Sequence, residues 1–256
     1  MSYKLIASVL LFFHSNWLNV IALIWFLFCF NGYMYYAKKH SYDHPCLASL
    51  LHKYRHQWML RMLTREMRIA DNAAIANLEK SVAFFASTTM LILAGLMTIL
   101  GSTEKAIGLM EGFPFSVTAS RTEWEVKIVV LIIVFVYAFF KFTWSLRQYG
   151  FVTIMVGAAP VESELSDEKE LDQNLNEKRE ALAKRIASMI SMAANNFNIG
   201  LRTYYYSIAI LTWFINPWFF MVSTTGIVFI LYRREFKSST LKILMMDDFG
   251  VPKPKK

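Results

Sequence analysis

The chain has 256 residues, of which 55% are hydrophobic and only 18% are charged, whereas soluble domains are usually about one quarter charged. The apolar residues are gathered into long runs, and a run of about 20 such residues crosses the hydrocarbon core of a bilayer. This excludes an ordinary soluble globular domain. The net charge is +8; in a membrane protein, Lys and Arg in cytoplasmic loops explain such an excess, so we expect no nucleic-acid partner.

The first predicted membrane span covers residues 17–36. Aromatic residues stand near both of its ends, where amphipathic rings prefer the headgroup region. The segment before it lacks a small-residue cleavage site, so we expect an interfacial segment there and no cleaved signal peptide. The positions of the two cysteines, Cys29 and Cys46, indicate neither a disulfide bond nor a metal site.

The next segment, residues 37–80, is richer in Lys and Arg than in Asp and Glu, which predicts a cytoplasmic location. Apolar residues recur within it at helical spacing, which predicts a cytoplasmic amphipathic helix over residues 47–80. They are Leu47, Leu51, Tyr54, Trp58 and Met62. No Pro or Gly separates this segment from the second span, residues 81–100, so the pattern predicts one long helix from 55 to 95.

Four arginines in this segment are candidates for binding a phosphate or an anionic lipid headgroup, because guanidinium groups match phosphate oxygens bidentately. They are Arg55, Arg61, Arg65 and Arg68. We expect Glu66 and Asp71 to pair with neighbouring arginines, and only Asp71 lies at a helix-neighbour spacing, three residues after Arg68. His52 and His56 share a helix face, but no zinc-binding pattern completes the site, so we predict no metal.

The second span, residues 81–100, carries small and hydroxyl side chains. Ala83 and Ser87 are four residues apart, with Gly95 two turns further on, and such positions let another helix approach closely in lipid. Ser87 and Thr88 are candidate pore-lining residues. The acidic and Gly-rich stretch 101–125 is expected outside the cell, and the third span covers residues 126–144.

Residues 150–160 are apolar but too short to span, so we interpret them as an interfacial or re-entrant segment. Residues 166–198 then predict a second cytoplasmic amphipathic helix, capped by Ser166, with an apolar stripe on one face. The stripe consists of Leu182, Ile186, Met189, Ile190, Ala193 and Phe197. A cluster of asparagines that ends at Asn198 is expected to end this helix before the membrane.

The last apolar run is too long for one span and short for two. The tail 235–256 is basic and should be cytoplasmic, which requires two spans, 199–216 and 217–234, separated at Asn216-Pro217. The sequence therefore predicts an all-α, polytopic transmembrane helical bundle. The whole chain, residues 1–256, forms one membrane domain with five spans, its N-terminus outside and its C-terminus in the cytoplasm. Four spans, the last kinked or forming a half-membrane hairpin, are the alternative.

The predicted spans contain no Asp, Glu or His near their middles, which disfavours proton-coupled transporters and intramembrane proteases. The chain also lacks a nucleophile elbow, a phosphate-binding loop and a dinucleotide fingerprint. We therefore predict no catalytic residue, no enzymatic activity and no cofactor.

Three stretches together are informative: RHQWMLRMLTREMRIAD at 55–71, SVAFFASTTMLILAGL at 81–96, and NFNIGLRTYYYSIAILTWFINPWFF with LYRREF at 196–236. They resemble a family of bacterial membrane proteins catalogued as a domain of unknown function. The resemblance implies a polytopic inner-membrane protein and no established activity. The motif positions that it singles out are Arg55, Trp58, Arg65, Glu66, Arg68, Asp71, Ser87, Thr88, Asn198, Arg202, Tyr205, Pro217, Trp218, Arg233 and Glu235.

Our first functional hypothesis is a non-enzymatic, homo-oligomeric pore or passive permeation protein. The second is a scaffold or accessory subunit of a membrane complex, which docks a partner or anionic lipid through its cytoplasmic amphipathic helices. A lipid-modifying enzyme is the third, and it depends on the histidines and carboxylates of residues 52–71. The expected partners are the bilayer itself, anionic lipids, and other copies or subunits.

Overall fold

The computed structural model describes residues 16–43, 46–110, 120–161 and 172–246. The N-terminal interfacial segment, the Ser166 cap and the end of the basic tail lie outside these residues. The described residues form helices and contain no strand. The helices are α2 (Trp17–Asp43), α3 (Leu47–Leu63), α4 (Ile69–Gly101), α5 (Thr103–Met110), α6 (Arg121–Gly157), α8 (Asp172–Trp213), α9 (Pro217–Phe236) and α10 (Ser239–Leu244).

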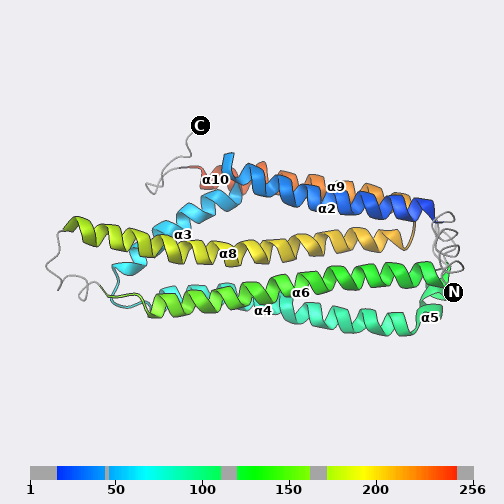
Figure 1. The fold of residues 1–256 in the computed structure, drawn as a ribbon, viewed down its shortest axis with the longest axis horizontal. Coiled ribbons are helices and arrows are strands. Elements are labelled where there is room, and N and C mark those ends of the chain that lie inside the picture. The colour runs from blue at the N-terminus through cyan, green and yellow to red at the C-terminus, as the bar shows by residue number, and fades with distance from the viewer. Residues whose placement is uncertain (1–15, 44–45, 111–119, 162–171, 247–256) are drawn as a thin grey trace, which may run out of the picture.

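The long helices α2, α4, α6, α8 and α9 lie side by side along the long axis, and α3 crosses them obliquely (Figure 1). α6 packs against α4 and α8, and α8 also packs against α3 and α9. α2 packs mainly against α9. The result is a bundle in which α6 and α8 occupy the middle.

Two hydrophobic cores follow one another along the bundle. We call the first the α3 core, since α3, α4, α6 and the first half of α8 build it. Its fully buried residues include Met59, Met62, Leu63, Ile75, Phe142, Val152, Val156, Ile186 and Ile190. The second, the α2 core, lies between α2, α6, α9 and the second half of α8. Its most buried residues include Ala22, Phe26, Ile128, Leu131, Tyr206, Ile210, Trp213 and Phe220.

Three helices are long and apolar enough to cross a membrane: Trp17–Ala37 within α2, α4, and α6. Only 17%, 22% and 39% of their most apolar windows are buried in the bundle. Large apolar side chains such as Phe28, Leu91 and Ile133 point outward. Lipid is a favourable environment for apolar surface of this extent and water is not, so the chain is a membrane-embedded protein.

The predicted continuous helix over 55–95 is wrong, because the chain breaks between α3 and α4. Thr64 ends α3 with its hydroxyl on the carbonyl of Arg61, and α4 begins only at Ile69. Met62 from α3 and Ile75 from α4 are buried in the same core. The chain must therefore fold back, and packing outweighs the absence of a helix breaker.

Two further boundaries differ from prediction. α6 continues to Gly157, so residues 150–157 are not a re-entrant segment; Val152 and Val156 are buried in the α3 core. α8 is continuous from Asp172 to Trp213, so the expected end of a helix at Asn198 is also wrong. All six residues of the predicted stripe on α8 belong to the α3 core or pack against it.

The break at Asn216-Pro217 is confirmed. Asn216 caps α9 by accepting a hydrogen bond from the backbone N–H of Trp218, and Pro217 stands in the first turn, where its missing N–H costs nothing. At the same end of the bundle, the buried Lys127 donates to the carbonyl of Trp213, the last residue of α8. The chain thus turns from α8 into α9 at a fixed point.

Gly200 permits the close approach of α8 to α6. A Cβ atom at this position would lie 2.4 Å from Cε1 of Phe142. Phe142 is fully buried, and its ring is 5.7 Å from that of Phe85 and 5.6 Å from that of Tyr204. The ring therefore has no free space into which it can move.

We predict that Gly200→Ala destabilises the protein by about 1–3 kcal/mol, because overpacking forces the two central helices apart. The measurement is the thermal unfolding midpoint of the detergent-purified chain. Gly226→Ala is the matched control, since nothing lies within 4 Å of a Cβ placed there. Equal midpoints for the two variants would show that the packing of α8 against α6 does not depend on this contact.

Candidate functional site

The buried carboxylate of Asp71, only 2% exposed, lies at the junction of α3 and α4. Its Oδ1 accepts hydrogen bonds from the indole N–H of Trp58 at 2.7 Å and from the guanidinium of Arg65 at 2.8 Å. The ion pair with Arg65 replaces the predicted pairing with Arg68, because the chain is not helical between 64 and 68. Glu66 is exposed on the turn.

The Arg68 side chain caps the end of α6. Its two terminal nitrogens donate to the carbonyls of Val156, Ala159 and Pro160 at 3.0, 2.6 and 2.7 Å. The last carbonyls of a helix have no partner within it, and a cation there also opposes the negative end of the helix dipole. Arg68 therefore fastens the α3–α4 turn to the far end of α6.

The other candidate residues of α3 face α8 or solvent. The guanidinium of Arg55 donates to the hydroxyl of Ser191 at 3.3 Å, and Nδ1 of His52 lies 2.9 Å from the same hydroxyl. Nε2 of His56 lies 3.3 Å from the carboxylate of Glu180. Arg61 is exposed. Three of the four candidate phosphate-binding arginines thus have protein partners that a phosphate would have to replace.

A second polar cluster joins α2, α8 and α9. Arg202 forms an ion pair with Glu235 at 3.2 Å, and both side chains are largely buried, at 14% and 17% exposure. The Arg202 guanidinium also lies 5.4 Å from the ring centre of Tyr33, a cation–π contact. On the surface beside it, Arg234 donates to the hydroxyl of Tyr205 at 2.7 Å.

The remaining candidates lie on the surface or in packing positions. Ser87 and Gly95 are exposed on α4, and nothing lies within 4 Å of a Cβ placed at Gly95, so none of the described helices packs closely there. The hydroxyl of Thr88 donates to its own helix, at the carbonyl of Phe84. Asn198 is half-buried. Pro217 is buried and Trp218 is 59% exposed.

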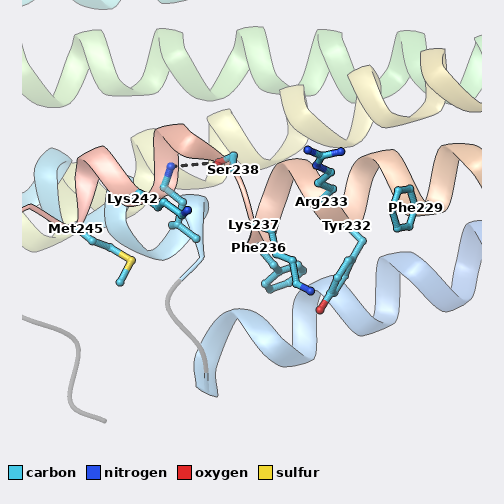
Figure 2. Close-up of a pocket in the computed structure, with 9 residues that line it drawn as sticks. Phe229, Tyr232, Arg233, Phe236, Lys237, Ser238, Lys242 and Met245 are labelled. Atoms are coloured by element: carbon cyan, nitrogen blue, oxygen red, sulfur yellow. Dashed lines mark hydrogen bonds between the residues drawn. The ribbon is translucent and has the colours of Figure 1, made fainter.

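A groove between the end of α9 and α10 was not predicted from the sequence. It has a volume of about 670 Å³, and both apolar and basic side chains line it (Figure 2). Arg233 belongs to it, together with Lys237 and Lys242. In the sequence these residues resemble an ordinary basic tail, and only the turn at Ser238, which caps α10, brings them together.

Apolar helices with outward-facing side chains, joined by buried polar contacts at their ends, define a polytopic helical membrane protein. The chain matches the family described as "Protein of unknown function, DUF599" over residues 21–240 and belongs to it. This confirms the resemblance to a domain-of-unknown-function family. No curated protein and no solved structure matches the chain.

We predict that Asp71→Ala lowers the free energy of unfolding by about 2–3 kcal/mol, because it leaves the Trp58 N–H and the Arg65 guanidinium without their acceptor. Asp71→Asn keeps an acceptor for Trp58 and should cost less. The control is Glu66→Gln, an exposed change in the same turn. Chemical denaturation of the purified chain measures all three, and equal stability for Asp71→Ala and Glu66→Gln would contradict the role of Asp71.

His52 predicts a pH dependence. Its pKa is lowered from the ordinary value of 6.5, first by burial and then by the nearby Arg55, His56 and Lys184. Below pH 6.5 the unfolded chain therefore binds a proton that the folded chain resists, and stability falls as the pH falls. Between pH 8 and pH 5 the wild type should lose more stability than His52→Gln. Parallel pH profiles for the two proteins would contradict this.

Proposed function

We propose that the protein is a non-enzymatic scaffold or accessory subunit of the bacterial inner membrane. It has five spans, its N-terminus outside and its C-terminus in the cytoplasm. The observation that supports the scaffold role most directly is the length of the central helices. α8 has 42 residues, and at about 1.5 Å per residue it is roughly 63 Å long, about twice the hydrocarbon thickness. α4 and α6 are also longer than a span requires.

The parts of the helices that exceed a membrane span lie at one end of the bundle, around the α3 core. We call this part of the protein the extension, and it comprises residues 47–80, 145–161 and 172–198. Charged side chains of α8 are exposed on it, including Glu177, Lys184 and Arg185, which favours water around it. The basic excess of residues 37–80 favours the cytoplasmic side. α8 and α9 then supply the fourth and fifth spans.

The tip of the extension supports docking of a partner protein. Met67 is 74% exposed, Ile69 71% and Ile154 68%. The Arg68 contacts with the end of α6 bring the turn that carries Met67 and Ile69 to the same tip as Ile154. Apolar side chains gathered in water are typical of an interaction surface, and the partner should present a complementary apolar patch.

A homo-oligomeric pore is the second candidate. The two cores are filled by side chains, so a permeation path would need several copies. The open face of α4 at Ser87 and Gly95 favours contact with another copy, because small residues allow close helix packing in lipid.

The topology predicts a labelling pattern for single cysteines, after Cys29 and Cys46 are replaced by serine. A membrane-impermeant maleimide should label Lys105→Cys in intact cells. It should label Glu177→Cys and Thr240→Cys only after permeabilisation. Labelling of Thr240→Cys in intact cells would instead favour four spans with a kinked last helix.

The scaffold proposal predicts the mass of the particle extracted gently from its native membrane. Native mass spectrometry should find one copy bound to other subunits, and Met67→Asp with Ile69→Asp should release them. Asn72→Asp with Asn77→Asp is the control, since it adds the same charge at exposed positions of α4. A lone chain would contradict the proposal, and a symmetric homo-oligomer would favour the pore, which liposome flux assays would then test.

A further inference from the structure

The groove between α9 and α10 combines features of an amphiphile site. Its lining includes the apolar residues Phe229, Phe236, Leu241 and Met245 and the three cations Arg233, Lys237 and Lys242; Figure 2 shows the cations at the end of α9 and on α10. Its volume of about 670 Å³ lies in the range of about 300–1,000 Å³ that is usual for small-molecule sites. We propose that this groove binds one anionic phospholipid of the cytoplasmic leaflet.

The charge of the groove favours an anion. Among the described residues that line it there is no Asp or Glu. The nearest carboxylate in the sequence, Glu235, pairs with Arg202 on the inner side of α9. Arg234 donates to the Tyr205 hydroxyl, whereas Arg233 is one of the residues that line the groove. An arginine fork and two lysines match the oxygens of a phosphodiester.

The location favours a lipid over a soluble anion. α9 carries outward-facing apolar residues up to Ile230 and then the basic residues of its last turn, which is the arrangement of a helix that leaves the membrane. α10 carries Ile243, which is 65% exposed and next to Lys242, and Met246, just after the helix, is also 65% exposed. Such a pattern suits a helix at the level of the headgroups, where acyl chains can reach the apolar residues of the groove.

The groove is also held open by its own contacts. The hydroxyl of Tyr54 on α3 donates to the carbonyl of Leu244 at 3.2 Å, and Leu241 is buried beneath α10. Ser238 caps α10 and so fixes the angle of the turn. Lys237 lies 5.7 Å from the ring centre of Tyr232, so its ammonium is kept over the groove. A lipid would therefore enter a site that is already formed.

The test is native mass spectrometry of the full detergent-purified chain during titration with dioleoylphosphatidylglycerol or dioleoylphosphatidylcholine. We expect one phosphatidylglycerol to be retained selectively. Each cation near an anionic surface contributes roughly fivefold in binding, so Arg233→Gln with Lys237→Gln and Lys242→Gln should weaken retention by about 100-fold. Lys237→Arg with Lys242→Arg keeps the charge and should retain the lipid.

The matched control removes the same charge from the extension, by Lys80→Gln with Lys184→Gln and Arg185→Gln, all exposed cations outside the groove. Equal loss in this variant, or no preference for phosphatidylglycerol, would overturn the proposal. Displacement of the lipid by millimolar inorganic phosphate would instead assign the groove to a soluble anion. The proposal depends on the proposed topology but not on the scaffold role. Failure of the topology would appear in cysteine labelling, whereas failure of the lipid site would appear only in lipid retention.

Discussion

The close contact of α6 with α8 is the constraint on which the rest of the structure depends. Gly200 offers no side chain, so the backbone of α8 can rest against the buried ring of Phe142. Because both helices run without a break through the α3 core and the α2 core, the two halves of the bundle share the same central pair. The contact at Phe142 therefore helps to fix how α6 and α8 lie against each other in both cores.

The buried cations of this protein stabilise helix ends and helix pairs. Lys127 donates a hydrogen bond to a carbonyl at the end of α8. Arg68 donates to three carbonyls, one in the last turn of α6 and two just after it. Arg202 is neutralised by Glu235 where α2, α8 and α9 meet. In lipid or in a packed core, an unpaired carbonyl or charge is costly. Pairing cations with helix ends from distant parts of the chain removes that cost and fixes the packing of the helices at the same time.

The sequence was sufficient where local chemistry decides the structure. The helix break at Asn216-Pro217 was predictable because Asn caps and Pro begins helices by local rules. The break before Ile69 and the continuity of α8 past Asn198 were not predictable from the sequence, because both depend on which surfaces the helices bury against each other. The same limit applies to the arginines: spacing alone suggested a phosphate site, and only the fold shows that Arg65 and Arg68 contact Asp71 and the end of α6.

The distribution of satisfied and open polar groups indicates where this molecule meets others. Inside the bundle, Lys127 and Arg68 donate to carbonyls and Arg202 pairs with a carboxylate. Side chains of the two cores fill the space between the helices. On the surface, the groove of α9 and α10 gathers Arg233, Lys237 and Lys242 without a carboxylate among its described lining residues. The tip beside Arg68 gathers apolar side chains without a cover from the described chain. In the proposed topology, the basic groove lies at headgroup level and the apolar tip lies beyond the bilayer. These two surfaces suit chemically different ligands, so lipid would orient the protein at one surface and a partner protein would bind at the other.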